Sequence, residues 1–156
     1  ARKRGRGSQK QTMAMVFAES TEVEKAKHKK GRPSRKCRYF KMLVCADMSK
    51  ETAKQAITSS VSETATKLTD GYSTYQKLAK EMSGFKTEVI PSAMAHIKLP
   101  WVHSAIGNLK RILNGIFHHT RPEYLQNYID EFCYKLNRRY LGNAIFHRGL
   151  ITLTLN

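Results

Sequence analysis

Apolar and polar positions divide the first part of the chain into two strands and a helix. An apolar run over residues 12–18 predicts a buried strand, and residues 37–46, rich in β-forming side chains, predict the strand that returns beside it. The polar and basic residues 20–36 between them predict a long hairpin loop. Ser49 is placed to cap a helix over residues 50–64, with Ala53, Ile57 and Val61 on one face.

Shorter periodic segments follow, and two longer helices come after them. Residues 65–69 and 85–90 predict strands, and residues 73–82 between them predict a helix. Apolar residues at spacings of three and four predict an amphipathic helix over residues 101–117. Its inward positions are Val102, Ile106, Leu109, Leu113, Ile116 and Phe117. A capping box at residues 120–123 predicts the next helix, which extends to about residue 140. Its inward positions are Leu125, Tyr128, Ile129, Phe132 and Leu136.

The order of these elements predicts a single mixed α/β domain whose helices cover a sheet that begins as a hairpin. The regular strand–helix alternation of a doubly wound fold is missing. Residues 142–156 show no clear pattern and are interpreted as a C-terminal tail. The length of 156 residues allows one domain of ordinary size.

Charge indicates the kind of partner. Lys and Arg number 28 and Asp and Glu number 12, so the formal net charge is +16. This excess favours a polyanion, and nucleic acid above all. No apolar run approaches the roughly 20 residues that span a bilayer, and no membrane partner is expected. Cys37, Cys45 and Cys133 form no paired or zinc-binding spacing, which favours reduced thiols in a cytosolic protein.

Three residues are candidates for chemistry. Asp70 ends a predicted strand, His103 lies early on the helix of residues 101–117, and Lys110 follows seven positions later. Seven helical residues at about 100° each return to nearly the same face, so His103 and Lys110 share one stripe. Each residue alone has a simpler interpretation: an Asp-Gly turn, a polar helix start and a solvated basic face.

Together these side chains suit a phosphodiester site. A carboxylate and a second ligand hold divalent cations, which stabilise charge on the reacting phosphate, and a Lys positions the DNA as a point charge.

Several motifs resemble one known family. They are Lys3-Arg4-Gly5-Arg6-Gly7, Lys29-Lys30-Gly31-Arg32-Pro33, Thr69-Asp70-Gly71-Tyr72, Leu99-Pro100-Trp101-Val102-His103 and Tyr128 to Tyr134 followed by Asn137-Arg138-Arg139. Their order and spacing resemble the catalytic domain of DDE-type insertion-sequence transposases, in the bacterial group that has Asn or His at the third catalytic position and is related to Merlin elements.

The resemblance implies an RNase H-like fold over residues 1–141, with a mixed sheet flanked by helices. It implies that Asp70 is the second catalytic Asp, that His103 occupies the third position and that both bind metal. Lys110 matches the Lys that follows. The implied cofactor is Mg²⁺ or Mn²⁺ in a two-metal site, and the implied partner is the double-stranded DNA of transposon ends. Assembly of several copies on that DNA and a bacterial cytoplasmic, nucleoid-associated location are also implied. The expected DNA-binding residues are Lys29, Lys30, Arg32, Lys110, Arg111, Arg138 and Arg139.

One departure from the family pattern bears on activity. The family carries its first catalytic Asp on a strand upstream of the Lys3–Gly7 motif, whereas the first acidic residue of this sequence is Glu19. We therefore expect the first strand and its Asp to be absent, and the chain as given to be inactive or severely impaired.

Two other functions remain open at this stage. A non-catalytic relic that binds DNA explains the absent Asp. A small basic RNA-binding protein explains the size and charge, but not the ordered Asp70, His103 and Lys110.

Overall fold

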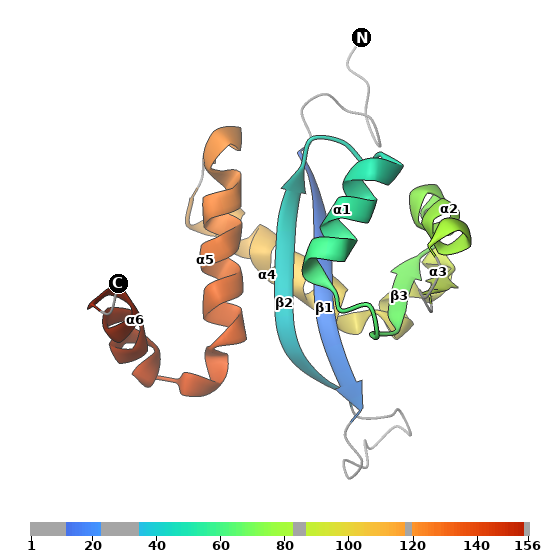
Figure 1. The fold of residues 1–156 in the computed structure, drawn as a ribbon. Helices are drawn as coiled ribbons and strands as arrows, with labels where there is room; N and C mark the ends of the chain where they lie inside the picture. The colour runs from blue at the N-terminus through green and yellow to red at the C-terminus, as the bar shows by residue number, and fades with distance from the viewer. Residues whose placement is uncertain (1–11, 23–34, 83–86, 118–119, 155–156) are drawn as a thin grey trace.

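The structure is a computed structural model that describes residues 12–22, 35–82, 87–117 and 120–154 (Figure 1). Its strands are β1 (Met13–Glu22), β2 (Arg35–Cys45), β3 (Lys67–Asp70) and β4 (Thr87–Ile90). Its α-helices are α1 (Lys50–Ser60), α2 (Ser73–Glu81), α3 (Ser92–Lys98), α4 (Pro100–Gly115), α5 (Leu125–Asn137) and α6 (Ala144–Thr154). Two 3₁₀ turns, η1 (Pro122–Tyr124) and η2 (Arg139–Leu141), flank α5. The expected mixed α/β class is confirmed.

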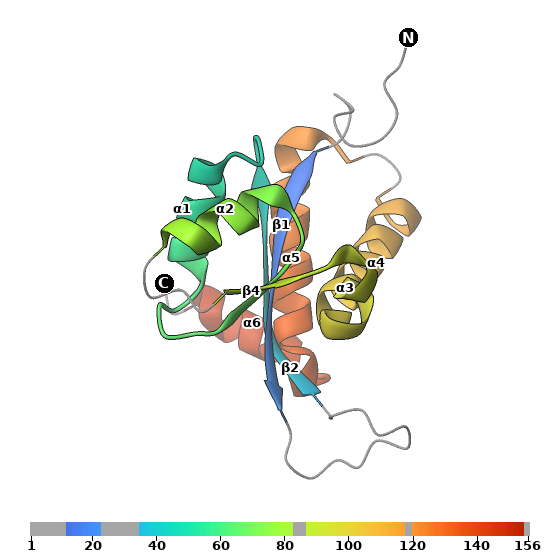
Figure 2. The ribbon, with the colours of Figure 1, turned by 90° about the vertical axis from the view of Figure 1, so that its right-hand side faces the viewer.

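The β1–β2 hairpin is the centre of the molecule and is covered on both faces. Its strands pair antiparallel, with Met15 opposite Leu43. One face packs on α1 and α2, through a cluster that includes Met15, Ala53 and Leu78. The other face packs on α4 and α5, and both views show these helices on the opposite side of the hairpin from α1 (Figures 1 and 2). The hairpin is therefore the middle of three layers.

The described strands do not form one continuous mixed sheet. The strands form two separate sheets, β1–β2 antiparallel and β3–β4 parallel, and no ladder joins them. In the second sheet Asp70 lies opposite Ile90. The sequence indicates which segments are extended, but which edges meet depends on long-range contacts that local pattern does not encode.

Several element boundaries also differ from the expected ones. The strands of the hairpin reach Glu22 and begin again at Arg35, so they extend into the expected loop of residues 20–36. The first helix ends at Ser60, because Val61 has extended backbone angles. The helix expected to reach residue 140 ends at Asn137.

The expected capping box is absent. Arg121 precedes η1, and no side chain caps that turn. A capping box needs Ser or Thr at the N-cap, but here Arg121 occupies that position and Thr120 lies one residue outside the turn.

Two helices were missed in the sequence. The short α3 is separated from α4 at Leu99, since the residue before a proline is disfavoured in the helical region. Helix α6 occupies the segment interpreted as a patternless tail, and it contains a glycine and two β-branched isoleucines that weaken a helical prediction. None of the described helices combines the length and the apolar character needed to cross a membrane.

Helix α5 covers the outer edge of β2 with side chains in place of a strand. Gln126 accepts from the Val44 N–H at 2.7 Å and donates to the Met42 carbonyl at 3.1 Å. Asn137 makes the equivalent pair of bonds to Phe40. The edge is thereby satisfied without a further strand on that side.

Candidate functional site

Asp70 is the last residue of β3, and its side chain is exposed. One carboxylate oxygen accepts a hydrogen bond from the backbone N–H of Tyr72 at 3.3 Å. This is the turn geometry that an Asp-Gly pair favours, so the simpler interpretation of Asp70 is confirmed. The carboxylate nevertheless remains open to solvent and able to take a further ligand.

A neighbour of Asp70 was missed in the sequence. Tyr75 lies on the first turn of α2, and burial raises its pKa to about 12, with a further contribution from the Asp70 carboxylate. Its ring contacts Tyr72 edge-on, with 6.1 Å between centroids. The phenol is therefore neutral at physiological pH beside the carboxylate. In the sequence, the feature that could have indicated this neighbour is an aromatic residue, Tyr75, about one helical turn after the Asp70-Gly71 pair.

His103 and Lys110 lie on the exposed side of α4. The buried side centres on Ala105, which is fully buried against the hairpin. Measured in the same direction around the helix, His103 and Lys110 lie about 160° and about 140° from Ala105, which places both on the opposite stripe. The shared stripe predicted from their spacing is confirmed.

The core side of α4 differs in detail from the expected one. The small Ala105 is fully buried in the cluster against the hairpin, whereas the larger Trp101, Leu109 and Ile112 pack around it and are partly buried. Ile116 was expected to face inward but is 67% exposed, since it follows the last helical residue.

Two buried polar atoms next to the candidate residues have no hydrogen-bond partner within the described part of the chain. They are the hydroxyl of Thr69, which precedes Asp70, and the indole N–H of Trp101, two residues before His103. Buried polar atoms of this kind normally have a hydrogen-bond partner in the protein or in ordered water.

The candidate metal ligands do not form a complete site. Asp70 supplies one carboxylate and His103 one imidazole. Among the described residues, no three His, Cys, Asp or Glu side chains lie close enough to hold a metal ion. A two-metal site needs carboxylates that bridge or flank both ions, so this donor set alone does not fit it.

The expected DNA-binding residues fall into three groups. Lys110 and Arg111 are exposed on α4. Arg138 stacks on Tyr134, with its guanidinium carbon 3.9 Å from the ring centroid. Arg139 donates to the carbonyls of Leu136 and Cys37, both at 2.7 Å, and so joins α5 to β2. Residues 29, 30 and 32 lie outside the described residues.

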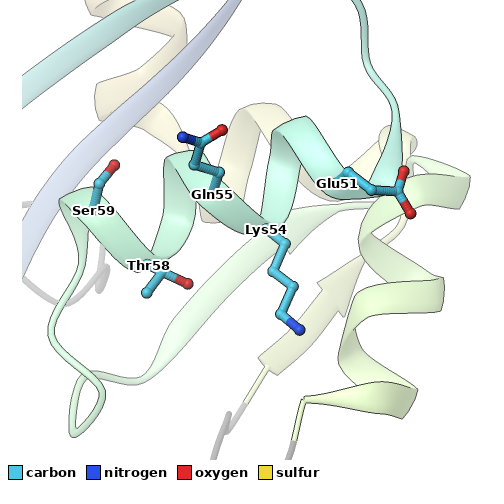
Figure 3. Close-up of a pocket in the computed structure, with 5 residues that line it drawn as sticks. All are labelled: Glu51, Lys54, Gln55, Thr58 and Ser59. Carbon is cyan, nitrogen blue, oxygen red and sulfur yellow. The ribbon is translucent and has the colours of Figure 1, made fainter.

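A hollow on α1 offers no alternative site. It is lined by Glu51, Lys54, Gln55, Thr58 and Ser59, all from the same helix (Figure 3). A surface formed by one helix cannot enclose a ligand. None of the candidate residues lines it.

Comparison with known proteins identifies the family. Searches of curated proteins and of solved structures return no match. The family model of the ISXO2-like transposase domain matches residues 1–137, which include Asp70, His103 and Lys110. Because this match covers most of the 156 residues, the chain belongs to the ISXO2-like transposase domain family.

Proposed function

We propose that the chain is the larger part of a transposase catalytic domain that cleaves DNA and transfers strands, with Mg²⁺ or Mn²⁺ as cofactor in the complete domain. Family membership over residues 1–137 supports this proposal. The DNA partner agrees with the net charge of +16. We assign the chain to the subgroup of transposases that has Asn or His at the third catalytic position, and this assignment would explain why His103 stands at that position.

The observation that carries the proposal is the exposed Asp70 carboxylate at the carboxyl end of β3. One of its oxygens makes a single hydrogen bond to the backbone, and the group is open to a metal ion. His103 is the proposed second ligand, and Lys110, two turns along the same stripe, is the proposed contact to a DNA phosphate. Each keeps its side chain in solvent, where a substrate can reach it.

We further propose an RNase H-like arrangement in which one more strand lies between β1 and β3 and carries the first catalytic Asp. Three features support it. Among the described residues the two sheets share no ladder, β1 and β3 point in opposite directions in Figure 1, and the Thr69 hydroxyl on β3 is buried without a hydrogen-bond partner. A strand in this place would pair with both edges and bring a second carboxylate near Asp70. Without that carboxylate, we propose that the chain as given has no DNA-cleaving activity or a severely reduced one.

Metal binding tests the assignment of Asp70. We expect calorimetric titration with Mn²⁺ to show weak saturable binding to the chain. Binding should be lost in Asp70→Ala and retained in the matched variant Glu51→Ala, which removes an exposed carboxylate from α1. Equal binding by Asp70→Ala would refute the ligand role. Cleavage of transposon-end DNA by the chain alone, abolished by Asp70→Ala, would refute the proposed inactivity.

Non-catalytic DNA binding is the second candidate function. It is favoured by the incomplete ligand set among the described residues. A longer form of the protein that contains an Asp-bearing strand before residue 1 distinguishes the two functions. Metal-dependent cleavage of DNA by that form would support the catalytic function. DNA binding without cleavage would support the non-catalytic one.

A further inference from the structure

A β-bulge interrupts the central hairpin near its loop end. Ala18 lies opposite Phe40, but Ser20 lies opposite Cys37, so the register changes by one residue. Glu19 on β1 therefore faces both Arg38 and Tyr39 on β2. A bulge of this kind breaks the strict alternation of side chains along the strand and re-aims one of them.

The bulge brings a cation and an aromatic ring together on the surface. The guanidinium carbon of Arg38 lies 5.5 Å from the centroid of the Tyr39 ring. Tyr39 is 51% exposed, and Arg38 and Lys41 are exposed as well. Both views show the loop end of the hairpin extending beyond α1 (Figures 1 and 2).

The charge around this surface indicates which kind of partner it would bind. Residues 25–46 contain nine Lys or Arg and no Asp or Glu. The acidic residues of β1 are Glu19, across the bulge, and Glu22, opposite Arg35. Glu19 makes no ion pair with Arg38 within the described residues. An exposed ring with Arg38 beside it and Lys41 two residues further along the strand suits a partner that offers a flat π-face between anionic groups.

We infer that the bulge is a contact site for unpaired nucleotides of DNA, with Tyr39 stacked on a base and Arg38 and Lys41 against the flanking phosphates. A base within a duplex is already stacked on its neighbours, so the ring requires an unpaired one. Stacking of this kind tolerates any base. The inference rests on the proposed function for its DNA partner, but it concerns a surface remote in sequence from Asp70 and His103.

The test uses fluorescence anisotropy with the full chain and two labelled DNA probes, a blunt duplex and the same duplex with a short single-stranded thymidine overhang. We expect the overhang to bind more tightly than the blunt duplex. Tyr39→Ala should weaken overhang binding about tenfold, whereas Tyr39→Phe, which keeps the ring, should bind as the wild type does. Tyr140→Ala removes another exposed tyrosine, 77% exposed on η2, and should have no effect.

Three charge variants add expectations with a stated direction. Arg38→Gln and Lys41→Gln should each reduce the slope of log affinity against log salt by about one. Glu19→Gln should tighten binding, because it removes the acid opposite the bulge. Thermal melts of each variant separate a folding defect from a lost contact.

The outcomes separate this inference from the proposed function. Equal binding of both probes, or an unchanged affinity in Tyr39→Ala, would overturn the inference and leave DNA binding by the domain intact. The same loss in Tyr140→Ala would also overturn it. Absence of binding to either DNA would overturn both. A third probe, a labelled single-stranded RNA of the same length as the overhang, tests the choice of DNA. Tighter, Tyr39-dependent binding to this RNA than to the DNA overhang would overturn that choice.

Discussion

The side-chain amide of Asn137 makes both of the hydrogen bonds that a neighbouring strand would make to Phe40. Its oxygen accepts from the Phe40 N–H at 2.7 Å, and its nitrogen donates to the Phe40 carbonyl at 2.8 Å. The two residues are 97 positions apart in the chain, so this contact fixes α5 against the hairpin.

Removal of this amide should destabilise the domain. Asn137→Ala leaves two partly buried backbone groups without partners, and we expect the free energy of unfolding to fall by about 2 kcal/mol. Urea denaturation measures it. Asn127→Ala, at an exposed position on the same helix, is the matched control and should change it by less than about 0.5 kcal/mol. Similar values for the two variants would contradict the edge role.

Opening the whole edge should cause self-association. Gln126→Ala combined with Asn137→Ala exposes the Phe40, Met42 and Val44 backbone groups, which then form a pairing edge for another chain. Size-exclusion chromatography at increasing concentration should show larger species. The control, Gln55→Ala with Asn114→Ala, changes two exposed positions and should elute as the wild type does.

Asp47 should make folding stability depend on pH in the acid range. Hydrogen bonds from Ser49 and from the Thr52 hydroxyl hold the pKa of its carboxyl below the ordinary value of 3.8. Because the folded pKa is lowered, the stabilisation is present above the unfolded pKa and is lost as pH falls through the folded one. Urea denaturation across this range should show a smaller loss for Asp47→Asn than for the wild type. Thr52→Val should reduce the dependence too, and an unchanged slope in both would contradict the assignment.

Two glycines should respond in opposite directions to alanine. A Cβ at Gly107 meets nothing within 4 Å, so Gly107→Ala should raise the free energy of unfolding by roughly 1 kcal/mol through helix propensity. Gly142 has equal room, but its φ of 52° is strained for other residues. Gly142→Ala should lower the same quantity by about 1 kcal/mol. Thermal and urea melts compare them directly.

The cysteines should react only when the fold opens. Burial raises the pKa of the Cys37 and Cys133 thiols, and both lie in the cluster between the hairpin and α5. Labelling with a thiol reagent at neutral pH should be slow for these two residues in native protein and rapid in urea. Rapid native labelling of Cys133, located by mass spectrometry, would contradict the packing of α5 on β2.

Much of the local structure followed from the sequence. The Ser49 cap is confirmed, since its hydroxyl accepts from the Thr52 N–H at 3.2 Å. The stripe of His103 and Lys110 is confirmed as well, because helical periodicity alone places them. The capping box at residues 120–123 was wrong, since the same four residue types can begin a 3₁₀ turn with no cap.

The site was only partly predictable. Asp70 at a strand end, His103 and Lys110 were identified by residue type and spacing. All three lie within the residues that the family model matches. Tyr75 was missed because its relation to Asp70 depends on how α2 folds back, which periodicity does not report.

The sequence by itself determined the strands of the hairpin, the amphipathic faces of α4 and α5, and the excess of positive charge, because each is a local or summed property of the residues. Tertiary structure alone decided that the strands form two sheets, that Asn137 and Gln126 close one edge, and that a bulge sets Arg38 and Tyr39 opposite Glu19. Those relationships join residues that are distant in the chain or depend on register. Their energies come from contacts that exist only when the elements pack together.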